Sequence, residues 1–331
     1  MSSKNFLLVY NDKAGTGSFH KKLQYIEKLF REKDICFKSI NIMDLNNIGQ
    51  VVILNDQREC ENLPQKSFSD SHATASPSLR MTMRHKKHDI VPVCLEDFDT
   101  VVAIGGDGTV LAVLPYIVSK NIKLGIIPCG TANLLAQKLN IPKNIPQAVD
   151  ILLNGTKKLI DVGKADDSYF VLRVGYGIDA DIVNGASSFL KNKFGYLAYL
   201  IQGLKCIFNL TPKSFEICTD NQCFKIKASA VIVSNSGNMF RDKCSIAPSS
   251  DVSDGKLDVF VLYARNIKEF LTVFFQILFN KHKIGSHVLY GKTHNISIKS
   301  ANNKFHIDGE ACSSQKVDIS LIHNGLAVMT P

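Results

Sequence analysis

Apolar positions follow two patterns along the chain, and the change between them falls near residue 160. Before it, short apolar runs precede stretches with helical spacing, whereas after it apolar and polar residues mostly alternate. The first pattern predicts strands buried on both faces and connected by helices, and the second predicts antiparallel strands with one buried face. The sequence therefore predicts a three-layer α/β domain with a mostly parallel sheet, followed by an antiparallel β-sandwich domain that also contains helices.

The predicted domain boundaries follow this change of pattern. The first domain spans residues 1–160 and is completed by a C-terminal strand at 324–331, and the second spans 161–323. Residues 55–90 mix Ser, Pro, Asn, Gln and charged residues, and they include a basic run at 80–88. Because so long a loop is uncommon inside a compact domain, we interpret 55–90 as an insertion. A solvated loop explains the basic run, and contact with a membrane or a partner is the alternative.

Individual elements follow from the same periodicities. In the first domain the strands are expected at 6–10, 35–42, 100–104 and 124–127, with helices at 21–33 and 143–155. In the second, strands are expected at 169–174, 215–218, 224–228, 231–234 and 257–262, with amphipathic helices at 187–209 and 270–279. Core packing explains both helices, and docking on an anionic membrane or lining an acyl-chain groove is the alternative.

Charge and cysteine content limit the function classes only in part. The net charge of +9 would attract nucleotides, anionic lipid headgroups or nucleic acid, and it does not choose among them. The N-terminal apolar run of about five residues is too short for a signal peptide or a membrane span, so a cytoplasmic protein is expected. The 9 cysteines are scattered without a CxxC pair, and we expect free thiols in a reducing compartment.

Two glycine-rich turns are the strongest candidate for a functional site. Each follows a short apolar run and leads into a helical pattern, so we expect both at one edge of the sheet. Glycines lack a Cβ and let backbone N–H groups approach a phosphate, and a helix N-terminus favours an anion. The two turns read Gly105-Gly106-Asp107-Gly108-Thr109 and Pro128-Cys129-Gly130-Thr131-Ala132-Asn133.

Asp107 adds a second requirement to this site. A carboxylate would repel phosphates unless it holds Mg²⁺ or accepts a hydrogen bond from a sugar or water. The turns therefore predict a nucleotide site with a metal, and a turn without a ligand is the alternative. No lysine follows the first turn, so it is neither a GxxxxGK[ST] nor a well-spaced GxGxxG motif.

GGDGT followed by IPCGTANLLAQKLNIP resembles the nucleotide site of the diacylglycerol kinase catalytic family, in particular its soluble bacterial lipid kinases. This family also includes sphingosine and ceramide kinases, and NAD kinases share GGDGT in a related fold. The resemblance covers most of the chain outside 55–90, and it implies ATP- and Mg²⁺-dependent phosphate transfer to a lipid hydroxyl. An NAD kinase that acts on a soluble dinucleotide and a non-catalytic lipid- or nucleotide-binding protein are the alternatives.

The resemblance also implies a set of nucleotide-binding residues. The family's NPxSG turn is similar to residues 11–15 and retains its Asn and Gly, and its VDIGK junction is similar to residues 160–164. That junction would place Asp161 in the metal network that faces the cleft. The implied positions are Asn11, Gly15, Gly105, Gly106, Asp107, Gly108, Thr109, Gly130, Thr131, Asn133 and Asp161.

Two further stretches carry implied roles. Residues 308–310 read DGE, which implies that Glu310 is the catalytic base and acts with Asp107, although Asp-Gly is also a frequent hairpin turn. His306 nearby is interpreted as structural. Residues 248–258 are similar to the family's P-x-A-x-x-x-DG-x-LD stretch, which implies a structural Mg²⁺. Its ligands would be Asp251, Asp254 and the backbone carbonyl of Lys256.

Three positions depart from the family pattern and keep the non-catalytic alternative open. Leu111 and Ala112 stand where members commonly have Asn and Glu, and Leu134 stands where many have Asp. The partners that the resemblance implies are a membrane lipid substrate, namely diacylglycerol or a related glycerolipid or sphingolipid, and an anionic membrane at which the protein associates peripherally. This places the reaction in phospholipid biosynthesis. No nucleic-acid partner is expected, and a homodimer is left open.

Overall fold

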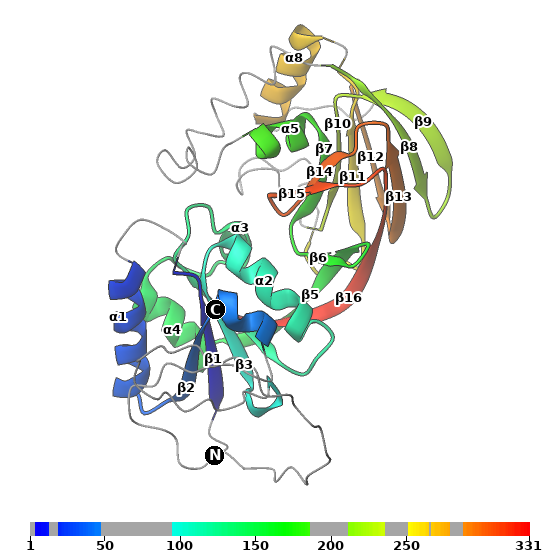
Figure 1. Ribbon diagram of the computed structural model, residues 1–331. Helices are drawn as coiled ribbons and strands as arrows, with labels where there is room; N and C mark the ends of the chain where they lie inside the picture. The colour runs from blue at the N-terminus through cyan, green and yellow to red at the C-terminus, as the bar shows by residue number, and fades with distance from the viewer. Residues whose placement is uncertain are drawn as a thin grey trace, which may run out of the picture.

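The computed structural model describes residues 4–12, 19–47, 95–185, 211–235, 251–264, 266–278 and 287–331. Figure 1 shows an α/β domain and a β-sandwich domain, and two long strands run from one to the other. The predicted insertion at 55–90 and the predicted helix at 187–209 lie outside the described residues. Within the described residues, no helix has the length and apolar character needed to cross a bilayer.

The α/β domain has a parallel sheet with the strand order β2-β1-β3-β4. All six residues of β3 are buried, as expected for a strand with helices packed on both sides of the sheet. The amphipathic helix α1 turns Leu23, Ile26 and Phe30 inward, and Phe30 packs edge-on against Phe6 of β1. The elements are β1 Asn5–Tyr10, α1 Phe19–Glu32, β2 Cys36–Asn41, the 3-10 helices Ile42–Asn47 and Leu95–Asp97, β3 Thr100–Gly105, α2 Asp107–Ile117, β4 Lys123–Pro128, α3 Leu134–Lys138 and α4 Ile145–Asn154.

The second domain is the predicted antiparallel sandwich. One sheet has the strand order β12-β11-β10-β7-β14-β15, and the other contains β16, β13, β8 and β9 in that order. Buried side chains from both sheets form its core, in which Tyr176 stacks on Phe305 and meets Phe215 edge-on. The elements are β5 Thr156–Ala165, β6 Ser168–Phe170, β7 Arg173–Gly177, α5 Ile178–Gly185, β8 Lys213–Thr219, β9 Cys223–Ala228, β10 Ala230–Ser234, β11 Leu257–Leu262, α8 Ile267–Leu278, β12 Val288–Thr293, β13 Asn295–Ser300, β14 Lys304–Ile307, β15 Glu310–Ser313 and β16 Lys316–Thr330.

Strands β5 and β16 form an antiparallel ribbon that belongs to both domains. Their pairing runs from Ile319 opposite Ala165 to Thr330 opposite Thr156, and the register shifts between Ile322 and Leu326. On its other edge, β16 pairs with β13 of the sandwich before the shift and with β4 of the parallel sheet after it. The parallel sheet and the sandwich sheet that contains β13, β8 and β9 are therefore one continuous hydrogen-bonded surface, and the ribbon fixes how the domains approach each other.

Asp161 stabilises the ribbon at this irregularity. Its side chain is fully buried on β5, and Oδ1 accepts hydrogen bonds from the Asn324 backbone N–H at 2.8 Å and from His323 Nδ1 at 2.8 Å. Oδ2 accepts from the Gly255 backbone N–H at 2.7 Å. The Asn324 N–H lies within the register shift, so this carboxylate satisfies a donor that the β-bulge leaves unpaired, and it also connects the ribbon to the turn that contains Gly255.

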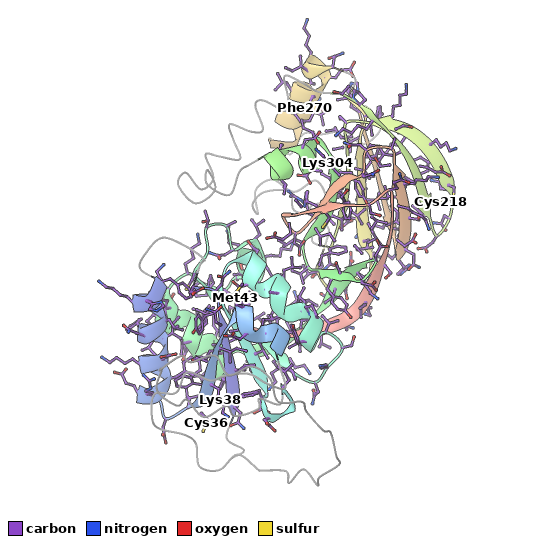
Figure 2. All side chains as sticks on the ribbon, in the orientation of Figure 1. Cys36, Lys38, Met43, Cys218, Phe270 and Lys304 are labelled. Carbon is purple, nitrogen blue, oxygen red and sulfur yellow. A yellow bond between two sulfur atoms is a disulfide. The ribbon has the colours of Figure 1, made fainter. Side chains whose placement is uncertain are left out.

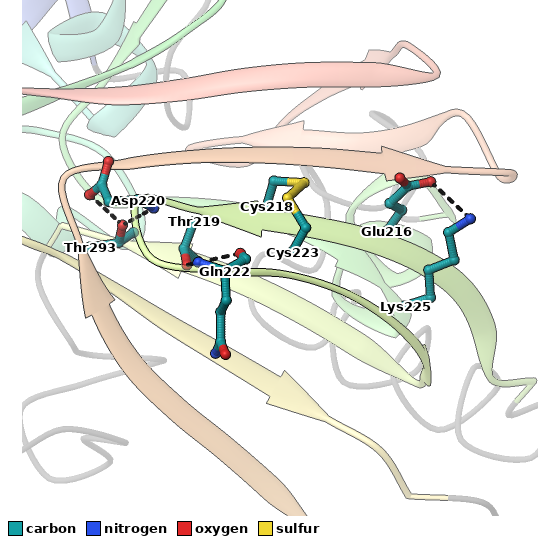
Figure 3. The surroundings of a disulfide bond; sticks show 8 residues. All are labelled: Glu216, Cys218, Thr219, Asp220, Gln222, Cys223, Lys225 and Thr293. Carbon is teal, nitrogen blue, oxygen red and sulfur yellow. Dashed lines mark hydrogen bonds and ion pairs between the residues drawn. A yellow bond between two sulfur atoms is a disulfide. The ribbon is translucent and has the colours of Figure 1, made fainter.

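The cysteines correct one expectation from the sequence. Cys218 and Cys223 form a disulfide across the last residue pair of strands β8 and β9, as Figure 3 shows. Cys36 is also disulfide-bonded, while Cys129 and Cys312 are free. Figure 2 places Cys36 in the α/β domain and Cys218 in the sandwich domain. The prediction of free thiols throughout was wrong because strand pairing decides which cysteines meet, and spacing along the chain does not reveal it.

Replacing Asp161 by Ala should lower the free energy of unfolding by about 3 kcal/mol, because the backbone N–H groups of Asn324 and Gly255 would lose the buried carboxylate that accepts from them. Thermal unfolding followed by circular dichroism measures the change. Asp167→Ala is the matched control, since the Asp167 side chain is fully exposed and should matter little. Equal midpoints for the two variants would show that Asp161 does not stabilise the ribbon.

Candidate functional site

The two glycine turns lie side by side, as the sequence predicted. Strands β3 and β4 are parallel neighbours whose last pair is Gly105 and Pro128. The carbonyl oxygen of Gly105 accepts hydrogen bonds from the N–H groups of Cys129 and Gly130, at 2.8 Å and 3.2 Å. These two backbone hydrogen bonds connect the first turn to the second.

Contact between the turns requires glycine on both sides. An ideal Cβ built on Gly130 would lie 2.5 Å from the Cα of Gly106, and one built on Gly106 would lie 3.3 Å from the Cα of Gly130. Both atoms belong to backbone, which cannot move aside as a flexible side chain could. The sequence predicts that these glycines contact a phosphate, and the structure adds that they allow the two turns to touch.

Thr109 and Asn133 lie beneath the turns. Thr109 is 2% exposed, and its side chain occupies the space into which a Cβ on Gly105 would project. Asn133 is 3% exposed and adopts a left-handed backbone conformation. Its side chain accepts from the Gly130 N–H at 3.0 Å and donates to the Gly130 carbonyl at 2.8 Å. These two predicted nucleotide-binding residues therefore hold the turns in shape from inside.

The open face of the site is formed by Gly108, Thr131 and Ala132, which are all exposed. Gly108 lies in the first turn of α2, whose N-cap residue Gly106 makes no side-chain capping hydrogen bond. The first N–H groups of a helix have no acceptor within it, and they carry part of the positive end of the helix dipole. An anion such as a phosphate fits this face, so the glycine turns can accommodate the phosphates of a nucleotide.

Asp107 connects the two turns through its side chain. Its Oδ1 accepts a hydrogen bond at 3.2 Å from the N–H of Leu135, in the first turn of α3. Burial raises the pKa of the Asp107 carboxyl, although N–H groups near the start of α3 act to lower it. Carboxylate oxygens are ligands that Mg²⁺ prefers, and one bonded N–H leaves lone pairs for an ion. Asp107 is therefore suited to act as a magnesium ligand.

Glu310 reaches this site from the sandwich domain. It is exposed at the first position of β15, and its Oε1 lies 3.7 Å from the position of an ideal Cβ on Gly108. The carboxylate therefore lies beside the open N-terminus of α2, where a negative charge is stabilised. Figure 1 shows the β14–β15 hairpin extending from the sandwich toward the α/β domain. Gly108 and Glu310, which are far apart in the sequence, thus lie side by side.

Asp308 holds the hairpin that carries Glu310. Its carboxylate accepts backbone hydrogen bonds from Val171 at 2.8 Å, Leu172 at 3.0 Å and Arg173 at 2.7 Å. Burial raises the pKa of this carboxyl to about 6, against the effect of the three donors. These bonds also explain why residues 169–174, predicted as one strand, divide into β6 and β7: the backbone turns its N–H groups toward Asp308 between them.

Three predicted positions remain, namely Asn11, Gly15 and Asp161, of which Asn11 lies at the same sheet edge as the first glycine turn. Asn11 directly follows β1, the neighbour of β3 in the sheet, and Gly15 lies outside the described residues. Both oxygens of Asp161 accept backbone N–H groups at the ribbon, which accounts for its burial without a ligand. Asp161 was expected to face the cleft and the metal network, and that role stays a prediction beside these structural bonds.

In the structure, the carboxylates of the predicted structural magnesium site accept hydrogen bonds from other groups of the protein. Asp254 accepts from Lys292 Nζ at 2.6 Å and from the Lys256 N–H at 3.0 Å, and Asp251 accepts from the Ser253 N–H and hydroxyl. A metal here would have to displace the Lys292 ammonium group. Across the residues described, no group of three or more His, Cys, Asp or Glu side chains could hold a metal ion. This metal site stays a prediction.

The structure is therefore that of a two-domain protein, in which two touching glycine turns of an α/β domain are approached by a carboxylate from a β-sandwich domain. Residues 5–165 match the family described as "Diacylglycerol kinase catalytic domain". Residues 173–330 match the "YegS C-terminal NAD kinase beta sandwich-like domain".

Similar proteins support the same family. The chain is 32% identical over 229 residues to a diacylglycerol kinase of Bacillus subtilis, which covers 67% of this chain and 75% of that protein. It is 26% identical over 239 residues to a diacylglycerol kinase of Staphylococcus carnosus, and the match covers 71% of this chain and 78% of that protein. A crystal structure of a diacylglycerol kinase from Bacillus anthracis superposes with a TM-score of 0.68 at 20% sequence identity, and the match covers 100% of this chain and 98% of that chain. The two proteins therefore share the same fold. The chain belongs to the diacylglycerol kinase catalytic-domain family, a family of lipid kinases.

Replacing Gly130 by Ala should separate the two turns, because the new Cβ would meet the Gly106 backbone. We expect a lower unfolding midpoint and an affinity for ATP reduced by about tenfold or more. Calorimetric titration with ATP measures the affinity. Gly291→Ala is the control, since no atom lies within 4 Å of its added Cβ. If both variants bound ATP as the native protein does, the contact between the turns would not matter for the nucleotide.

Proposed function

We propose that this protein transfers the γ-phosphate of ATP to a hydroxyl group of a membrane lipid, either diacylglycerol or a related glycerolipid or sphingolipid. The observation that carries the proposal is the position of the Glu310 carboxylate beside Gly108. It brings a group able to accept a proton to the open end of α2, next to the glycine turns. Membership of the lipid kinase family supports a lipid as the phosphate acceptor, and the relatives named diacylglycerol kinases suggest which one.

In this proposal the ATP phosphates lie on the open face formed by Gly108, Thr131 and Ala132. Backbone N–H groups at the start of α2 donate hydrogen bonds to the phosphate oxygens, and the absence of a side chain at Gly108 leaves room for the approach. Thr109 and Asn133 act indirectly, by keeping both turns in place from below.

Asp107 would hold Mg²⁺ at the phosphates. When bound, the ion would neutralise the charge that develops on the transferred phosphoryl group. The Leu135 N–H fixes the orientation of the Asp107 carboxylate, so its remaining lone pairs point in a defined direction before any ligand enters.

Glu310 would accept the proton of the lipid hydroxyl. As the hydroxyl oxygen forms its bond to the γ-phosphorus, the bond from that phosphorus to the bridging oxygen breaks, and ADP leaves with the bonding electrons. The proton passes to Glu310, and catalysis depends mainly on holding the reacting atoms in line.

The lipid would reach this cleft from the surface of an anionic membrane. The net charge of +9 supports such a contact, because each basic residue near an anionic surface adds attraction. Association of this kind is peripheral, and it leaves the reacting hydroxyl near the bilayer surface.

Replacing Glu310 by Gln should lower kcat by about a hundredfold or more while the affinity for ATP changes little, because the amide keeps the shape but cannot accept the proton. The assay uses labelled ATP, Mg²⁺ and mixed micelles that contain diacylglycerol, phosphatidylglycerol, ceramide or sphingosine. Glu216→Gln is the control, because Glu216 lies on β8 at the far side of the sandwich.

Three outcomes would contradict the proposal, each in a different way. Unchanged turnover in the Glu310→Gln variant would exclude Glu310 as the base. Label in NAD and none in lipid would identify a kinase for a soluble dinucleotide. Binding of ATP or lipid with no transfer to any acceptor would identify a non-catalytic member of the family.

A further inference from the structure

A buried polar chain lies directly behind Glu310. His306 of β14 is 1% exposed, and its Nε2 lies 2.9 Å from Oδ2 of Asp179, which is 5% exposed on α5. Oδ1 of the same carboxylate accepts a hydrogen bond from the Arg173 guanidinium at 3.1 Å. On its other side, His306 Nδ1 accepts from the Gly309 backbone N–H at 3.3 Å. The chain therefore ends at the Asp308–Gly309 peptide, one residue before Glu310.

These contacts define the protonation of His306. A backbone N–H can only donate, so Nδ1 must carry a lone pair, and the ring proton lies on Nε2 and is donated to Asp179. Burial opposes ionisation of Asp179, but Arg173 and His306 outweigh it and hold the pKa of the carboxyl below its usual range. An ionised Asp179 in turn fixes the ring in the orientation that presents Nδ1 to Gly309.

The neighbouring strand leaves room for this arrangement. Gly175 of β7 is the register partner of His306. A Cβ on Gly175 would collide with both Oδ2 of Asp179 and Nε2 of His306. The hydrogen-bonded side chains of His306 and Asp179 therefore occupy the space that a side chain at position 175 would fill.

The turn before Glu310 depends on such support. Asp308 has a φ of 47°, a left-handed conformation that is costly for a residue with a side chain, whereas Gly309, with a φ of +91°, adopts it readily. Asp308 is held by backbone N–H groups on one side, and Gly309 is held by His306 on the other. Arg173 contributes to both supports of the turn. Its backbone N–H donates to Asp308, and its guanidinium donates to Asp179, which holds His306.

We propose that His306 is a positioning residue for Glu310: its Nδ1 fixes the Gly309 peptide and thereby aims the Glu310 carboxylate at the site beside Gly108. This inference rests on the proposed role of Glu310 as the base. Stability alone does not account for the polar groups Arg173, Asp179 and His306 in the sandwich, because apolar residues of similar volume usually give a folded state that is at least as stable. A positioning role explains why the polar chain is retained and why it ends at this turn.

Two variants of His306 separate positioning from packing. Asn places an amide oxygen near the position of Nδ1 and can accept from Gly309, whereas Gln places its amide near Nε2 and keeps the contact with Asp179 alone. We expect kcat in the micelle assay to fall by about thirtyfold in His306→Gln and by no more than about threefold in His306→Asn, with the KM for ATP little changed in both. His294→Gln is the matched control, since His294 is exposed.

A second measurement does not depend on activity. Hydrogen exchange followed by NMR should show the Gly309 amide protected in the native protein and in His306→Asn, and exposed in His306→Gln. Equal kcat in both variants, or a greater loss in His306→Asn than in His306→Gln, would overturn the positioning role. If His306→Gln did not fold, a thirtyfold loss in a folded His306→Asn protein would overturn it too. Absence of lipid phosphorylation by the native protein would instead contradict the proposed function, while the Gly309 exchange pattern would still test the contact.

Discussion

The structure depends on one buried carboxylate at the irregularity of a ribbon that two domains share. Strand β16 begins in the sandwich and ends in the parallel sheet, and Asp161 satisfies the backbone N–H groups of Asn324 and Gly255 where the strand changes partners. A continuous ribbon resists bending much more than a flexible linker would. The hairpin with Glu310 and the turn with Gly108 are therefore brought together by the sheet itself rather than by a loop.

Polar groups concentrate where the two domains meet, and each has partners there. Asn133 and Asp107 hold the glycine turns, and Asp308 and His306 hold the hairpin opposite them. Groups fixed before a ligand binds need little reorganisation when it does, which is how a kinase can gain rate from positioning and electrostatics. The Glu310 carboxylate itself remains exposed and open to substrate, whereas Asn133 and His306, two of the supporting groups, are buried.

Local pattern predicted much of this fold, and long-range pairing explains what it did not predict. The apolar run of β3, its glycine turn and α2 follow from periodicity and from the conformational demands of glycine, and so does their pairing with β4. The division of 169–174 into two strands depends on Asp308, which lies more than a hundred residues away, so no local signal reveals it. The same holds for Asp179 on α5, whose partner His306 comes from β14, more than a hundred residues away. The resemblance to a kinase family directed attention to Glu310, but only the fold brought that residue to Gly108.

The central claim is that the two glycine turns receive the phosphates of ATP and that Glu310 faces the terminal phosphate from the sandwich domain. A crystal structure of the protein with Mg²⁺ and a non-hydrolysable ATP analogue tests it most directly. The account predicts the phosphates on the exposed face at Gly108 and Thr131, with the γ-phosphate between Gly108 and the Glu310 carboxylate. Phosphates bound away from these turns, or a Glu310 side chain directed away from the γ-phosphate, would contradict it.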